Sequence, residues 1–205
     1  MTQLLLDPGA TIKRAIEPDD IAPMGRYGEQ RKALRSRMIA YKKNRRMQLG
    51  PCCTLLFENF HTMLYQVYEM LYTEGNTPGQ LEEELNAYNP LIPRGNALSV
   101  TMMLDIADPE QRQRLLSQLG GVEDTIFLRC CNWSIKADYE QEVERTTDEG
   151  KTSAVHFLHF RFSPEQAQNF FLNAANHATI KIEHPSYNHA AAIPPEVREA
   201  ISKDL

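Results

Sequence analysis

Apolar residues in the first third of the chain recur at helical spacing. Between Tyr27 and Met47 they are separated by three, four or seven positions, which predicts a helix over this range. Gly50-Pro51 ends the helical pattern, because proline cannot continue a helix and glycine tolerates the terminal turn. The apolar run Cys52–Phe57 then predicts a short strand, and the patterns at His61–Tyr72 and Gln80–Tyr88 predict two further helices.

The second half of the chain contains two similar units, which start near Ser99 and Ser153. Each unit has a strand pattern, a capping residue, the sequence Pro-Glu-Gln, an amphipathic helix pattern and two short strand patterns. Asp108 and Ser163 are the predicted N-caps, and the proline after each takes the first helical position. We therefore predict an α+β fold, with an N-terminal helical part followed by a duplicated β-α-β-β arrangement. Its strands would form a largely antiparallel sheet with helices on one face.

One detail separates the two units. The apolar strand positions of the first unit have the opposite parity, counted from the proline, to those of the second. A bulge or a changed strand–helix turn would reconcile them. Before the units, the sequence NPLIPRGN at 89–96 predicts an irregular connector. We therefore divide the chain into two parts. Residues 1–96 form an N-terminal segment and a helical lobe with a basic helix, and residues 97–205 form the duplicated β-α-β-β sheet domain. We expect the two parts to pack together as one compact unit.

Composition is typical of a globular protein. Of the 205 residues, 42% are hydrophobic and 24% charged, and no run approaches the roughly 18 apolar residues that span a bilayer. The first residues, MTQLLLDPGA, lack the basic start and long apolar stretch of a secretory signal. We therefore expect a cytoplasmic protein with no membrane contact, in which the four cysteines are reduced thiols.

Charge is distributed unevenly. The segment from Arg26 to Arg46 holds nine Lys or Arg residues and one acid, a charge of +8, so the rest of the chain carries −13. Exposed ion pairs contribute only about 0–1 kcal/mol each, so fold stability hardly explains so many cations. We predict that this segment binds acidic protein, in this chain or in a partner, and that its main contacts are Arg35, Lys42, Lys43, Arg45 and Arg46. Nucleic acid is a less favoured alternative because the chain as a whole is acidic. Self-association is left open.

Four short stretches of the chain are distinctive: LLFEN at Leu55–Asn59, YNPLIP at Tyr88–Pro93, TSAVH at Thr152–His156 and HPSY at His184–Tyr187. With these stretches the chain resembles an uncharacterised bacterial family, DUF3501, and the similarity runs from about Pro18 to Leu205. The resemblance implies that the gene for this protein lies near genes for rubrerythrin and for a heterodisulfide-reductase-like iron–sulfur oxidoreductase, as the genes of family members often do. It therefore implies a redox or peroxide-response setting, and it brings no catalytic residues. On this basis we expect a non-catalytic accessory or docking protein with one of those two proteins as its acidic partner.

Three histidines are candidates for a second kind of site. His156 shares the parity of apolar strand residues, where burial would shift its pKa. His184 and His189 flank the predicted turn at 185–188, and a hairpin would bring them opposite each other, close enough to share a ligand. No cofactor is predicted, but these residues make a protein that binds a metal ion or cofactor the alternative hypothesis.

Two pairs of adjacent cysteines, Cys52-Cys53 and Cys130-Cys131, give the four thiols that a zinc or iron–sulfur site uses. Neighbouring residues in a strand point to opposite faces, so we expect one thiol of each pair in the core and the other at the surface. The sequence also lacks a Gly-x-Ser-x-Gly elbow, a phosphate-binding glycine loop and a dinucleotide fingerprint. Enzymatic function is therefore the weaker expectation.

Overall fold

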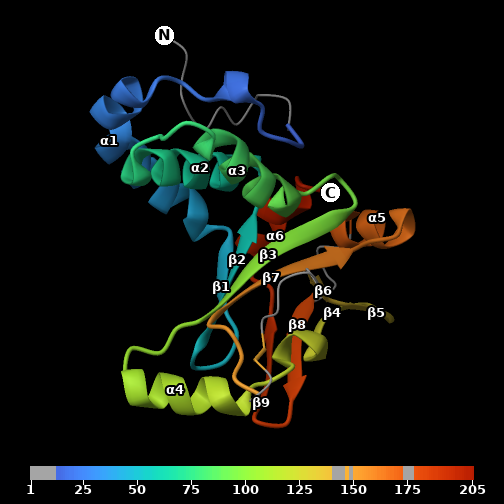
Figure 1. The fold of residues 1–205 in the computed structure, drawn as a ribbon. Helices are drawn as coiled ribbons and strands as arrows, with labels where there is room; N and C mark the ends of the chain where they lie inside the picture. Colours follow the sequence, from blue (N-terminus) through green and yellow to red (C-terminus); the bar gives the residue numbers. More distant parts are fainter. Residues whose placement is uncertain (1–12, 140–145, 148–149, 173–177) are drawn as a thin grey trace.

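The computed structural model describes residues 13–139, 146–147, 150–172 and 178–205 (Figure 1). The helices are α1 (Met24–Lys43), α2 (Phe60–Glu74), α3 (Gln80–Tyr88), α4 (Pro109–Gln118), α5 (Pro164–Leu172) and α6 (Pro195–Ser202), with the 3-10 turns η1 (Pro18–Asp20), η2 (Asn89–Leu91) and η3 (Val122–Thr125). The strands are β1 (Arg46–Gln48), β2 (Cys53–Glu58), β3 (Ala97–Leu104), β4 (Ile126–Cys130), β5 (Trp133–Lys136), β6 (Asp138–Tyr139), β7 (Val155–Arg161), β8 (Thr179–His184) and β9 (Tyr187–Ala192). The predicted α+β class is confirmed.

The strands form two antiparallel sheets. Sheet A has the order β1-β2-β3-β7-β6, and sheet B has the order β5-β4-β8-β9. Every neighbouring pair of strands is antiparallel, as predicted, but the strands are divided between two sheets where the sequence suggested one. The division arises because α4 and α5 carry the chain out of sheet A, after which the two hairpins that follow them pair with each other through β4 and β8.

The predicted duplication is visible in this pairing. One unit is β3-α4-β4-β5 and the other is β7-α5-β8-β9, and their first strands pair with each other at the centre of sheet A. Both predicted caps are formed: the Asp108 carboxylate accepts from the Gln111 N–H (2.7 Å), and the Ser163 hydroxyl accepts from the Gln166 N–H (3.2 Å). The strand–helix connections differ, with residues 105–108 before α4 and 162–163 before α5. The units therefore depart from each other at the turn that the parity mismatch pointed to.

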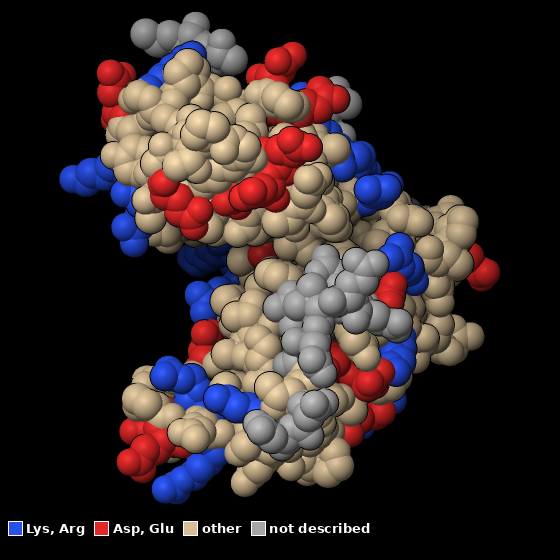
Figure 2. All heavy atoms as spheres, in the orientation of Figure 1, with Lys and Arg blue, Asp and Glu red and all other residues tan. Residues whose placement is uncertain are grey.

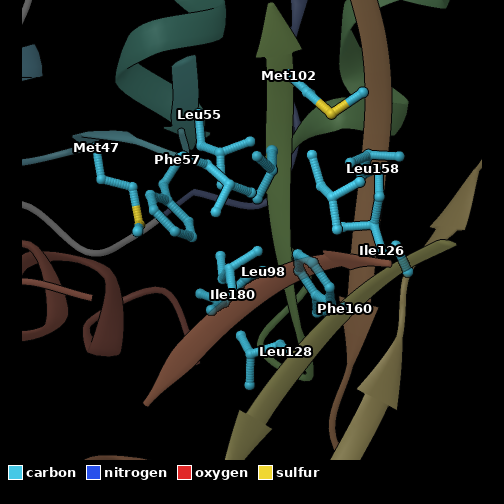
Figure 3. Packing of buried hydrophobic residues seen from close by; sticks show 14 of the residues in the cluster. Met47, Leu55, Phe57, Leu98, Met102, Ile126, Leu128, Leu158, Phe160 and Ile180 are labelled. Atoms are coloured by element: carbon cyan, nitrogen blue, oxygen red, sulfur yellow. The ribbon is translucent and has the colours of Figure 1, made fainter. Parts of the chain in front are cut away.

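The main hydrophobic core lies between the two sheets. Figure 3 shows Leu98 and Phe160 of sheet A facing Leu128 and Ile180 of sheet B. All four side chains are almost fully buried, and burying such a side chain contributes about 1.5–3 kcal/mol. A second cluster lies above the opposite face of sheet A, where residues of α1, α2 and α3 pack together and Phe157 of β7 joins them. Sheet A is therefore covered on both faces.

Helix α1 ends earlier than the sequence pattern predicts. It stops at Lys43, and Arg46–Gln48 form β1, which is antiparallel to β2. The reason is that Met47 and Leu49 reach the main core as alternating residues of a hairpin. The hairpin turns at Gly50, whose φ of 75° lies in the left-handed region.

The division at 96/97 falls inside one sheet, because β2 pairs with β3 along its whole length. The helical lobe and the two units therefore share sheet A. In the part of the chain that the structure describes, no helix is long and apolar enough to cross a bilayer.

Candidate functional site

The outward side of α1 carries predicted basic residues around one apolar side chain. Arg35, Ile39, Lys42 and Lys43 are spaced by four, three and one positions, which places them on one side of the helix; we call these four residues the basic face. Ile39 is 64% exposed, more than Tyr72, the other large hydrophobic residue that is exposed in the described part of the chain. Within the described ranges, no carboxylate lies within ion-pair distance of the three cations. Figure 2 shows Lys and Arg side chains along the left margin of the molecule, from α1 toward α4. The surface is hollowed between these two helices.

Arg45 is a correction to the predicted contact set. Its side chain is buried, with 2% of the residue exposed, because it leaves the helix and turns under the C-terminal segment. The guanidinium donates to the Asp204 carboxylate and to the Phe57 (2.9 Å) and Ala200 (3.3 Å) carbonyls. A residue used in this way holds the C-terminus on β2 and is not available to a partner.

Two other cations of the basic segment have internal partners. Arg31 donates to both Glu69 oxygens, at 2.9 and 2.8 Å, and this hydrogen bonding holds the pKa of Glu69 below its ordinary value. Arg46, in β1, is about half exposed and lies 3.6 Å from Asp105. Arg46 therefore lies at the surface, whereas Arg31 serves the packing of α1 on α2.

His156 is a buried core residue. Its Nε2 lies 3.1 Å from the Thr152 hydroxyl and 3.0 Å from the Ser153 carbonyl, and its Nδ1 lies 3.9 Å from the buried Glu123 carboxylate. In sheet A it stands opposite Met102 on the inner face. Nε2 is therefore hydrogen-bonded within the protein, and Nδ1 faces the Glu123 carboxylate at a longer distance.

His184 and His189 are not opposite each other. The turn is two residues shorter than expected, so His184 pairs with Tyr187 and His189 pairs with Ile182. Both ring nitrogens of His184 have protein partners, the Gly120 carbonyl (3.3 Å) and the Ser186 N–H (3.2 Å). The His189 ring packs against Tyr187, with ring centres 4.4 Å apart. The geometry predicted for a shared ligand is therefore wrong.

The cysteines follow the expectation for adjacent strand residues. Cys53 and Cys130 are buried, Cys131 is exposed and Cys52 is partly exposed. Burial raises the pKa of Cys53 to about 12 and that of Cys130 to about 11, so both remain thiols at neutral pH. Among the described residues, no three or more His, Cys, Asp or Glu side chains are grouped so that they could hold a metal ion.

A cavity of about 330 Å³ lies beside the outer face of sheet A, and the sequence did not predict it. Its floor contains Ser99 of β3 and His159 of β7, and its wall is the connector that follows η2. Ser99 is buried, and its hydroxyl lies 3.1 Å from His159 Nδ1. His159 also stands opposite Asp138, because β6 leaves sheet B and joins the edge of sheet A.

The electrostatics of the cavity combine cations with an uncharged imidazole. Burial, followed by the charge of Arg161, lowers the pKa of His159, so its neutral form predominates at pH 7. Arg161 donates through Nε to the Asp138 carboxylate at 2.9 Å. Arg94, on the connector, is an exposed second cation at the cavity. The site therefore offers donors to an anion.

A signal for this cavity is present in the sequence. Phe157, His159 and Arg161 alternate with the core residues Leu158 and Phe160, so the polar residues necessarily share the other face. The pattern alone did not show what covers that face. Only the structure brings the connector and β6 to it.

These features define a two-sheet α+β protein with a cationic helix face and a polar cavity at the edge of one sheet. The chain belongs to the family described as a protein of unknown function, DUF3501, whose model matches residues 15–205. A solved structure of a novel protein of unknown function from Burkholderia pseudomallei is 34% identical, with a TM-score of 0.85, and the match covers 93% of this chain and 99% of that one. The comparison with curated proteins gave no match.

Proposed function

We propose that the protein is a cytoplasmic, non-catalytic docking protein whose basic face binds an acidic surface of a redox protein. The observation that carries the proposal is Ile39, which is 64% exposed on a folded helix and stands among Arg35, Lys42 and Lys43. Ile39 offers a partner one apolar contact, and the cations around it attract an acidic surface. Arg46 of β1 adds a further exposed cation.

The chemistry favours a protein partner over nucleic acid. A phosphate backbone is bound through cations and hydrogen-bond donors, and an isoleucine among the cations contributes nothing to that attraction. The cations of the basic face also lack internal carboxylate partners among the described residues, unlike Arg31, which is bound to Glu69. The candidate partners are rubrerythrin and a heterodisulfide-reductase-like iron–sulfur oxidoreductase, which the family resemblance implies as genetic neighbours.

The test measures binding of the purified protein to each of these two candidates by calorimetry at low and at high salt. Reversing three charges in one variant, Arg35→Glu, Lys42→Glu and Lys43→Glu, is expected to weaken binding by at least about tenfold, or about 1.4 kcal/mol. Binding by the wild type should also weaken as salt rises, because screening reduces attraction between exposed charges. Ile39→Ser tests the apolar centre separately and should weaken binding at both salt concentrations.

The control reverses two exposed arginines elsewhere, Arg112→Glu and Arg114→Glu on α4. This variant keeps the basic face and should bind nearly as well as the wild type. If both charge-reversal variants lost the same affinity, the partner would recognise the net charge of the protein and not the basic face. Failure of the wild type to bind either redox protein would overturn the proposal.

A further inference from the structure

The cavity beside His159 has three properties of a ligand site: volume, rigidity and defined polar groups. Its volume of about 330 Å³ lies at the lower end of the range of small-molecule sites, about 300–1,000 Å³. Its lining joins the apolar surfaces of Ile92 and Pro93 to the polar groups of His159 and Arg161. The residues of the basic face do not line it, so a ligand here would be independent of the docking function.

The wall of the cavity is held in place by partly buried hydrogen bonds. Arg14 donates to the Pro93 carbonyl (3.1 Å) and to the Asp204 carbonyl (2.6 Å), so the connector is tied to the C-terminal segment. Asn89 exchanges two hydrogen bonds with the backbone of Ile16, at 2.7 and 3.1 Å. A wall fixed before the ligand arrives reduces the entropic cost of binding.

The floor presents one imidazole edge to the cavity. Because His159 Nδ1 contacts the buried Ser99 hydroxyl, Nε2 is the ring nitrogen left for a ligand. Arg161 uses Nε for Asp138, which leaves its terminal nitrogens for a second interaction. Arg94 has no ion-pair partner among the residues that the structure describes.

The charges at the cavity indicate the class of ligand. Arg94 and Arg161 contribute two positive charges, Asp138 contributes one negative charge and His159 is neutral, so the net charge is +1. A carboxylate carries one negative charge and matches this, whereas a phosphate monoester carries about −1.5 to −2 at neutral pH. Guanidinium groups also bind carboxylates through paired hydrogen bonds.

We propose that this cavity binds a small organic monocarboxylate, with the carboxylate on Arg94 and Arg161, a polar group of the ligand on His159 Nε2, and its apolar part against Ile92 and Pro93.

The experiment follows the His159 ring by NMR of the full-length, nitrogen-15-labelled protein during titration with benzoate and with pyruvate. At least one of the two is expected to shift the His159 signals saturably, and benzamide, the uncharged analogue of benzoate, is expected to bind at least about tenfold more weakly than benzoate. Inorganic phosphate should not compete. No saturable shift with either acid, or equal binding of benzoate and benzamide, or stronger binding of phosphate, would each overturn the proposal.

Variants connect the signal to the site. Arg94→Ala and Arg161→Ala should each weaken binding of the acid by about tenfold, because each removes a charged donor. Arg112→Ala, an exposed arginine of α4, is the matched control and should bind as the wild type does. The charge reversal of the basic face should also leave acid binding unchanged, so failure of the docking proposal and failure of this one are distinguishable. Loss of binding in the Arg112→Ala control, or full binding in both cavity variants, would contradict the assignment.

Discussion

Replacing Arg45 by methionine tests the most buried charge pair that the structure describes. Arg45 and Asp204 have side chains that are only 3% and 4% exposed. Their ion pair is joined by the bonds of Arg45 to the Phe57 and Ala200 carbonyls. Arg45→Met removes the cation and leaves the carboxylate buried without it. Removing one member of a buried pair destabilises a protein by about 3–5 kcal/mol, because the remaining charge is uncompensated.

The assay is urea unfolding followed by circular dichroism. With a urea dependence of about 2–3 kcal/mol/M, the midpoint of Arg45→Met should fall by about 1–2.5 M with an unchanged slope. The neighbouring residue gives the matched control: Arg46 is about half exposed, and Arg46→Met should change the free energy of unfolding by about 0.5 kcal/mol or less. The double variant Arg45→Met, Asp204→Leu removes both charges and should recover much of the loss.

The pH dependence supplies a second reading of the same variant. Burial raises the pKa of Asp204, while Arg45 partly offsets this rise. Without Arg45 the pKa should rise further, so the folded variant takes up a proton at a higher pH than the unfolded chain does. A group whose pKa is raised on folding makes stability fall as pH rises through that pKa. The deficit of Arg45→Met should therefore shrink toward acidic pH, and a deficit equal to that of Arg46→Met at pH 7 would refute the reasoning.

Three further outcomes follow from local contacts. Asn59→Ala should cost about 1 kcal/mol in urea unfolding, because its side chain accepts two backbone N–H groups at the start of α2. Gly50→Ala should lower stability more than Gly75→Ala. Both glycines have a positive φ, but only at Gly50 would an added Cβ lie 2.7 Å from the ring of His189 in β9. Equal melting temperatures of the two variants would contradict this prediction. Arg31→Gln should be less stable than the wild type at neutral pH, and the two stabilities should converge as pH falls below 4.5. The reason is that the stability due to the lowered pKa of Glu69 is lost when that carboxylate is protonated. Stability curves of the two proteins that run parallel over this pH range would contradict the prediction.

Local signals predicted the elements well where the element is decided locally. Helix α3 has the predicted bounds, Gln80–Tyr88, and both Pro-Glu-Gln helices begin at their predicted caps, Asp108 and Ser163. Capping residues and proline act within a few positions, so a short window contains the whole cause. The repeated β-α-β-β pattern was visible for the same reason.

The predictions that failed depend on contacts between distant residues. Arg45 fits the basic pattern of α1, and its burial depends on Asp204, which is 159 positions away. The positions 46–48 could continue a helix until β2 is known to pair with them. The relative positions of His184 and His189 depend on the length of the turn in the last hairpin. The sequence pattern predicted a four-residue turn at 185–188, but the turn has two residues. The cavity forms because the chain passes from sheet B to sheet A between β5 and β6. The periodicity within a single strand contains no information on which sheet that strand joins.

The two faces of sheet A explain why the cavity is a better candidate for ligand chemistry than the buried histidine of the core. The inner face is largely apolar and accounts for stability, and His156 is held there by the contacts of its Nε2 with Thr152 and Ser153. The outer face holds a row of polar residues across four strands, in which Glu58 stands opposite Ser99, Ser99 opposite His159, and His159 opposite Asp138. Burying such groups costs about 1–3 kcal/mol each where hydrogen bonds are incomplete, and one buried oxygen of Glu58 has no hydrogen-bond partner among the described residues. Three members of this row, Ser99, His159 and Asp138, line the cavity, so the polar row supports the ligand proposal made for it.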